Sequence, residues 1–147
     1  MFNMKVLLVG NYALDQQRSM LGFAEALRSG LIQKGLNVRV VAPQALAARL
    51  LPSRSASNGV RKWLGYFDKF VLFPIALRRA AKWADIVHIC DQGNAMYVKH
   101  LSRKSQIVTC HDLLAMQASR GEFSGWVVGK SGQKFQQLIL SGLKQAC

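Results

Sequence analysis

The sequence predicts an α/β fold built on a Rossmann-like, doubly wound parallel sheet. Short apolar runs of the kind that form strands alternate along the chain with amphipathic segments of helical period. These runs are apolar throughout, as expected of strands that helices cover on both faces. With 147 residues, half of them hydrophobic, the chain suits one domain over residues 1–147, with a sizeable core.

The start of the chain is predicted to form a complete β-α-β unit. Residues 4–9 form an apolar run typical of a buried strand, and a turn follows at 10–12. Apolar residues then recur at helical spacing, with Ser19 as the predicted N-cap and Gly35 as the C-terminal glycine. Residues 37–42 form the second strand, and the crossover between the two strands should be right-handed.

The middle of the chain is predicted to be helical. A short helix is expected at 44–51 and a Ser-containing loop at 52–59. A longer helical segment covers 60–83, and Pro74 should kink or break it. Residues 84–90 then form the third strand.

The last part of the chain repeats this alternation. We expect a loop at 91–94, a short helix at 95–101 and a fourth strand at 107–110. A loop containing Gly and Ser follows, and then an amphipathic helix whose apolar side carries Phe135, Leu138, Ile139 and Leu143. The chain ends within or just after this helix with no further strand, which predicts that the domain is cut short.

The charge of the chain restricts its partners. Twenty Lys and Arg stand against seven Asp and Glu, which gives a net charge of +13. A surface this basic attracts polyanions such as nucleic acid, anionic lipid headgroups or phosphorylated small molecules. Charge alone does not choose among them.

The cysteines and the apolar segments indicate the compartment. Cys90, Cys110 and Cys147 form neither a zinc-ligand spacing nor a disulfide framework, and the first two end apolar runs as buried thiols often do. We therefore expect no metal and a reducing cytosol. No segment has the ~20 apolar residues of a membrane span, and no signal peptide is evident. The expected protein is soluble in the cytoplasm or lies on the inner face of the membrane.

The main candidate site lies at the end of the fourth strand. His111 and Asp112 directly follow its apolar run. In parallel sheets the ligand crevice lies beyond the carboxyl ends of the strands, so this titratable pair can reach a substrate there. The alternative is structural: Asp112 caps the next helix, beside a hydrogen-bonded histidine.

Two further loops end at the same expected edge. Gly10, Asn11 and Tyr12 follow the first strand, where a glycine lets a ligand approach the backbone. This loop has neither G-x-G-x-x-G nor a P-loop signature, and a plain turn is an equal alternative. Asp91 and Asn94 follow the third strand and could face the same crevice. His88, inside that strand, is expected to be a hydrogen-bonded core residue, and His100 to lie on the surface.

The basic middle is a second candidate surface. Eight Lys or Arg and one acid, Asp68, lie between Arg49 and Lys82, interleaved with aromatic residues. This pattern describes an interfacial helix, in which each basic residue near an anionic leaflet adds about 1 kcal/mol. The candidate membrane-facing residues are Arg61, Lys62, Trp63, Lys69, Arg78 and Arg79. The alternative is a helix that packs on its own domain and has a solvated basic face.

In this order, the predicted strands, helices and loops resemble the N-terminal domain of a family 4 glycosyltransferase with the GT-B fold. The resemblance covers nearly the whole chain, and the strand end Val108-Thr-Cys-His-Asp112 is its most specific piece. The other pieces are the runs 5–11, 18–20, 84–91 and 94–97.

The resemblance implies one half of a two-domain enzyme. In that family the N-terminal domain holds the acceptor, a glycan or a lipid-linked molecule, and the C-terminal domain holds the nucleotide-sugar donor. Transfer retains the anomeric configuration and needs neither a metal nor a cofactor beyond the nucleotide sugar. The residue matching His111 contacts the donor sugar. The candidate donor- and acceptor-binding residues are Gly10, Asn11, Tyr12, Ser19, Asp91 and Asn94.

The chain departs from the family in two respects. Gly10 stands alone where many members have paired glycines, and no C-terminal domain with its E-x7-E pair is present. The chain should therefore be inactive alone and require that domain as a partner. Two other classes stay open: a non-enzymatic polyanion-binding module, and a Rossmann-type nucleotide-cofactor enzyme, which the missing glycine fingerprint disfavours.

Overall fold

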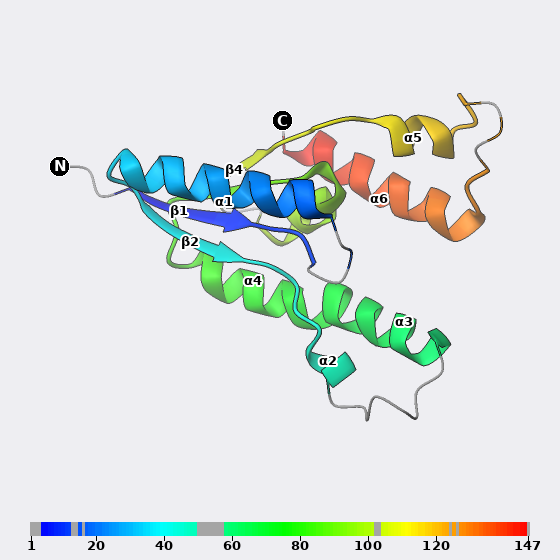
Figure 1. The fold of residues 1–147 in the computed structure, drawn as a ribbon, viewed down its shortest axis with the longest axis horizontal. Coiled ribbons are helices and arrows are strands. Elements are labelled where there is room, and N and C mark those ends of the chain that lie inside the picture. The colour runs from blue at the N-terminus through cyan, green and yellow to red at the C-terminus, as the bar shows by residue number, and fades with distance from the viewer. Residues whose placement is uncertain are drawn as a thin grey trace.

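The protein has a four-stranded, all-parallel sheet with the strand order β2-β1-β3-β4 (Figure 1). The computed structural model describes residues 4–12, 15, 17–49, 58–101, 104–123, 125 and 127–146. The strands are β1 (Lys5–Val9), β2 (Asn37–Val41), β3 (Ile86–Ile89) and β4 (Ser105–Val108). The predicted parallel α/β class is confirmed. Strands β1, β2 and β3 lie within the predicted runs, whereas β4 begins and ends two residues before the predicted run 107–110.

Helical segments connect the strands. In chain order they are α1 (Arg18–Gln33), α2 (Leu46–Arg49), α3 (Asn58–Phe67), a π-helical turn (Asp68–Leu72), α4 (Phe73–Ala81), a 3-10 helix (Gln92–His100), α5 (Leu114–Ser119) and α6 (Lys130–Gln145). Helix α5 lies where only a loop was expected. No helix in the described ranges combines the length and the apolar character needed to cross a bilayer.

Helices cover both faces of the central strands. Val6 and Leu8 pack against α1 on one face. Leu7 and Val9 pack against α4 and the 3-10 helix on the other. Figure 1 shows α1 and α4 on opposite sides of the sheet, the arrangement that right-handed crossovers require when the strand order reverses at β1. Double-sided burial explains why the β1 run is apolar throughout.

Strand β4 differs from its prediction. The run 107–110 was expected to be buried on both faces, but β4 is the edge strand of the described sheet and Ile107 is 49% exposed. Ile107 pairs in register with His88, on the face of the sheet where α1 packs against Val6 and Leu8 of β1. Strand β4 pairs with β3 on one side only, so its other side has no neighbouring strand in the described sheet.

At Pro74 the predicted kink or break takes the form of a π-helical turn just before the proline, in a chain that stays helical from 58 to 81. Helix α3 ends at Phe67, the π-helical turn follows, and α4 then begins with Pro74 in its first turn. A proline there lacks only an N–H group that would have no partner in the helix. The wider π turn absorbs the change in the hydrogen-bond ladder.

The two predicted ends of α1 have different outcomes. Gly35 has a φ of 80°, so the predicted C-terminal glycine is confirmed. Ser19 is not the N-cap, because α1 already begins at Arg18 and Gln17 occupies the cap position without a side-chain cap bond. Instead, the Gln17 side chain accepts a hydrogen bond from Asn11. A tertiary contact therefore holds the start of this helix.

Candidate functional site

A cleft of about 450 Å³ lies at the carboxyl ends of β1, β3 and β4. It opens where the strand order reverses between β1 and β3, which is where ligands bind in open α/β sheets. The segments that follow these three strands line it, together with the start of α1 and the middle of α6. The cleft brings together the candidate residues Asn11, Tyr12, Ser19, Asp91, Asn94, His111 and Asp112.

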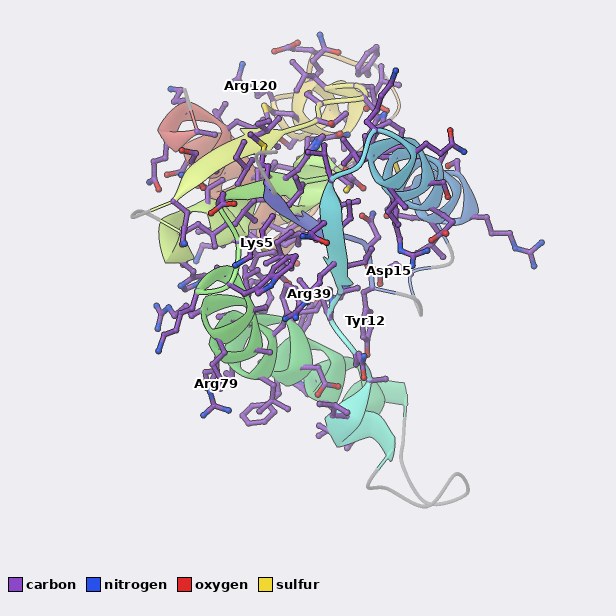
Figure 2. The ribbon with its side chains drawn as sticks, turned by 90° about the vertical axis from the view of Figure 1, so that its left-hand side faces the viewer. Lys5, Tyr12, Asp15, Arg39, Arg79 and Arg120 are labelled. Carbon is purple, nitrogen blue, oxygen red and sulfur yellow. The ribbon has the colours of Figure 1, made fainter. Side chains whose placement is uncertain are left out.

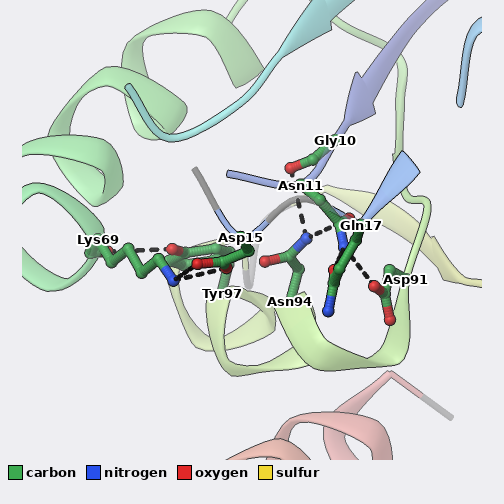
Figure 3. A network of polar contacts seen from close by, with 8 residues as sticks. All are labelled: Gly10, Asn11, Asp15, Gln17, Lys69, Asp91, Asn94 and Tyr97. Carbon is green, nitrogen blue, oxygen red and sulfur yellow. Dashed lines mark hydrogen bonds and ion pairs between the residues drawn. The ribbon is translucent and has the colours of Figure 1, made fainter. Parts of the chain in front are cut away.

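Buried amides and a carboxylate form the floor of the cleft (Figure 3). The Asn11 amide nitrogen donates hydrogen bonds to the side chains of Gln17 and Asp91. Its amide oxygen accepts one from Asn94 Nδ2 at 2.9 Å, and the same nitrogen lies 3.3 Å from the Gly10 carbonyl oxygen. These bonds tie the loop after β1 to the loop after β3, which stand 80 residues apart in sequence.

Asp91 also starts the 3-10 helix. It occupies the N-cap position, and its Oδ1 accepts a hydrogen bond from the Gly93 N–H at 2.8 Å. Both carboxylate oxygens are therefore engaged, and the side chain is buried. Asp91 organises the floor, and little of it is left to contact a ligand.

His111 is held at the wall of the cleft by three contacts. Its backbone N–H donates to Gln92 Oε1 at 2.9 Å, and its ring meets the edge of Phe23 at 4.8 Å between centroids. Nε2 lies 3.0 Å from the Cys90 carbonyl oxygen. A carbonyl only accepts, so Nε2 carries a proton. In the neutral tautomer with that proton, Nδ1 is an acceptor, and it has no hydrogen-bond partner among the described residues. The exposed imidazole can thus take a hydrogen bond or a proton from a hydroxyl in the cleft.

Asp112 makes the helix-start contact that the structural alternative predicted. Its Oδ1 accepts a hydrogen bond from the Leu114 N–H at 3.1 Å, which caps the turn into α5. Asp112 does not hold the imidazole, because His111 Nε2 faces the Cys90 carbonyl instead. Asp112 still lines the cleft and is exposed, which leaves its second oxygen able to meet a ligand.

An ion pair between Lys69 and Asp15 lines the other side of the cleft. Lys69 Nζ lies 2.6 and 2.8 Å from the two Asp15 carboxylate oxygens (Figure 3). The same nitrogen lies 4.7 Å from the centre of the Tyr12 ring. Tyr12 is buried, and burial, with smaller contributions from Asp68 and Asp15, raises its pKa. Lys69 was expected to face a membrane, but it lines the cleft. The π-helical turn that carries it directs this side chain inward.

The backbone of Gly10 has a structural role. Its N–H donates to the Val41 carbonyl at 2.8 Å and so continues the β1–β2 ladder. A Cβ here would meet Ala42 Cβ at 3.8 Å, an ordinary contact, so the position does not require glycine. Gly10 is not among the residues that line the cleft.

The other two histidines lie outside the cleft. His88 Nε2 is 2.7 Å from Thr109 Oγ1, and burial lowers the pKa of this half-buried ring. The predicted hydrogen bond of His88 is confirmed, but the predicted core position is wrong, because the ring is half-buried and belongs to none of the core clusters of the described residues. Arg78 donates to His100 Nδ1 at 2.9 Å, and burial, Arg78 and Lys99 lower the pKa of His100.

Sequence reasoning missed several polar residues of the cleft. Gln17, Gln92 and Gln136 line it, but glutamines in loops and helices belong to no motif. The only signal for them in the sequence is position. Gln17 and Gln92 follow strands that end at the ligand-binding edge of the sheet already identified. The side chains of Arg61 and Lys62, expected to face a membrane, lie outside the described residues.

The two described cysteines should differ in reactivity. Burial raises the pKa of the Cys90 thiol to about 11. Burial, Asp112 and Asp91 also raise the pKa of Cys110, but this thiol, predicted to be buried, is exposed and open to reagent. The thiolate is the nucleophile, so a raised pKa lowers reactivity at a given pH. In a Cys147→Ser background at pH 8, we expect iodoacetamide to modify Cys110 at least about tenfold faster than Cys90, by mass spectrometry. Rates that are equal would contradict the burial of Cys90.

Within the described part of the chain, no three His, Cys, Asp or Glu side chains group to hold a metal ion. No protein-family model, curated protein or solved structure matches the chain. The cleft combines a free imidazole acceptor, neutral amides and carboxylates at a switch point. Such groups can bind and orient the hydroxyls of a substrate.

Proposed function

We propose that this chain is the acceptor-side half of a glycosyltransferase, which moves a sugar from a nucleotide-sugar donor to a glycan or lipid-linked acceptor. The observation that carries the proposal is His111, which presents a free Nδ1 in a cleft at the switch point of a parallel sheet. The resemblance of the sequence to family 4 glycosyltransferases supports the same activity. From that resemblance we propose a retaining, metal-independent transfer.

The chemistry explains why a second domain is required. Glycosyl transfer passes through an oxocarbenium-like state and releases a charged leaving group, so it needs an enclosed, preorganised site. An open cleft cannot exclude water or hold both reactants in line. We propose that a separate nucleotide-sugar-binding domain closes over the cleft. His111 then orients or stabilises the reacting sugar, and Asp112 meets the acceptor hydroxyl.

The direct test is transfer itself. The chain, joined to a GT-B nucleotide-sugar-binding domain, is incubated with nucleotide sugars and glycan or lipid-linked acceptors, and products are detected by mass spectrometry. We expect product from the joined protein and none from the chain alone. Absence of transfer with every donor and acceptor class would count against the proposal.

We further propose that the protein docks on an anionic membrane from the cytoplasmic side. Exposed apolar side chains recur every three or four residues along α3, the π turn and α4, and we call them the exposed aromatic face. Its members are Val60, Trp63, Phe67, Phe70, Val71 and Ile75. Trp63 is 75% exposed, whereas Phe73 and Leu77 on the inner side of α4 are buried.

Basic residues continue this surface. Arg78, Arg79 and Lys82 are exposed at the end of α4, and Figure 2 shows Arg79 on the side of the molecule away from α1. Aromatic residues that insert at the headgroup level, beside cations that meet anionic lipids, describe an interfacial helix. The inner side of α4 packs on the domain as the alternative predicted, and the outer side is available to lipid.

The membrane proposal predicts a loss of vesicle binding in Phe67→Asp. Removing a Phe that is proposed to insert into the lipid and adding a charge should weaken binding to phosphatidylglycerol vesicles at least about tenfold in a flotation assay. Ile32→Asp on α1 is the matched control, because Ile32 is 44% exposed and Phe67 is 47% exposed. Equal binding by both variants would contradict the proposal. Tight, salt-sensitive oligonucleotide binding without vesicle binding would instead support a polyanion-binding module.

A further inference from the structure

The cleft has the opposite charge from the chain as a whole. The sequence carries a net charge of +13. The described ionisable side chains that line the cleft are three carboxylates, Asp15, Asp91 and Asp112, and one ammonium, Lys69, with His111 counted as uncharged. Three negative charges and one positive charge leave a net charge of −2 in the cleft.

The one cation is not available to an anionic ligand. Both carboxylate oxygens of Asp15 hold Lys69 Nζ, and the Lys69 side chain is 20% exposed. The N-terminus of α1 also points to the cleft through Ser19 and Met20, but a helix N-terminus contributes only about half a positive charge. The cleft therefore repels a phosphate group, in contrast to the basic surface outside it.

The remaining lining suits a neutral polyol. The amides of Gln17, Gln92 and Gln136 can donate to and accept from hydroxyl groups. The second carboxylate oxygen of Asp112 can accept a hydroxyl hydrogen bond strongly. Phe135 and the methionines supply apolar surface for the C–H face of a sugar ring.

We infer that the cleft takes an uncharged, hydroxyl-rich glycosyl group as its acceptor and rejects the phosphorylated form of the same group. This inference rests on the proposed function, and it narrows the acceptor to one chemical class. The excess positive charge of the chain then acts outside the cleft and plays no part in recognising the acceptor group.

Methionine methyl NMR can test this selectivity on the chain itself. Met20, Met96 and Met116 line the cleft, while Met4, just before β1, lies outside it and reports off-site effects. The probes are glucose, mannose and N-acetylglucosamine, each paired with its 6-phosphate. We expect the neutral sugars to shift the three cleft methyls and the phosphates to bind at least about tenfold more weakly.

A charge variant sharpens the test. Asp112→Asn keeps an oxygen for the Leu114 N–H and removes one negative charge, so binding of the 6-phosphates should rise severalfold. Glu122→Gln removes an acid outside the cleft and should leave both probe sets unchanged.

Two results would overturn the inference. One is binding of the 6-phosphates as tight as that of the neutral sugars. The other is no shift of the cleft methyls by either probe set. The transfer assay judges the proposed function separately, since a working transferase that prefers a phosphorylated acceptor would remove only the charge selectivity.

Discussion

Replacing His111 with alanine is expected to lower sugar transfer by about 10²–10⁴-fold in the chain joined to a nucleotide-sugar-binding domain, the range typical of a lost acid–base or orienting group. The Cys90 carbonyl and the Phe23 edge hold the ring, so its free Nδ1 has a defined position. Alanine removes that acceptor and leaves the rest of the cleft in place. The initial rate of product formation measures the effect.

The controls separate a lost site from a lost fold. His111 is exposed, so His111→Ala should keep the circular dichroism spectrum and lower the free energy of unfolding by only about 1 kcal/mol, the worth of its hydrogen bond. His100→Ala is the matched control, because His100 bonds to Arg78 and does not line the cleft. Transfer that survives His111→Ala at the wild-type rate would remove this residue from the site.

Gly142→Ala should give the largest loss of stability. Helix α6 packs on the 3-10 helix so closely that a Cβ at Gly142 would lie 2.0 Å from the Ala95 carbonyl oxygen and 2.5 Å from its carbon. Backbone atoms cannot rotate away as a side chain can, so the two helices must separate. We expect the free energy of unfolding to fall by about 3 kcal/mol, at the upper end of overpacking effects. This lowers Tm by roughly 6–12 °C in a domain of this size, as thermal denaturation would record.

Other glycines supply the control for this effect. Gly22 lies in α1 with no atom within 4 Å of its would-be Cβ, so Gly22→Ala should raise stability by up to about 1 kcal/mol. Because α6 carries Phe135 and Ile139 into the cleft, Gly142→Ala should also weaken sugar binding. A Gly142→Ala protein as stable as Gly22→Ala would show that α6 does not pack on Ala95 in solution.

Local sequence signals predicted the elements of the sheet well. Runs of apolar residues located the strands, because burial on both faces selects such residues wherever a central strand occurs. Pro74 located the π-helical turn before α4, and Gly35 the end of α1, because each acts through its own backbone. The same reasoning placed His111 and Asp112 beyond the last strand, and both line the cleft.

Contacts between distant residues limited the prediction. The Asn11–Asp91 bond spans 80 residues and sets the cleft floor. A second hydrogen bond from the same Asn11 amide goes to Gln17, which occupies the cap position of α1 in place of the predicted Ser19. Nothing near Lys69 in the sequence indicates that Asp15 draws it inward. These side chains are held by partners that only the folded chain supplies.

The sequence by itself determined where the strands lie, that they run parallel, and at which edge of the sheet chemistry can occur. It could do so because backbone propensity and burial act on neighbouring residues. Only the tertiary structure decided that β4 is an edge strand, that the Cys90 carbonyl orients His111, and that the cleft is negative in a chain of net charge +13. Total charge is a sum over composition, whereas the field at a site depends on which charges the fold brings together.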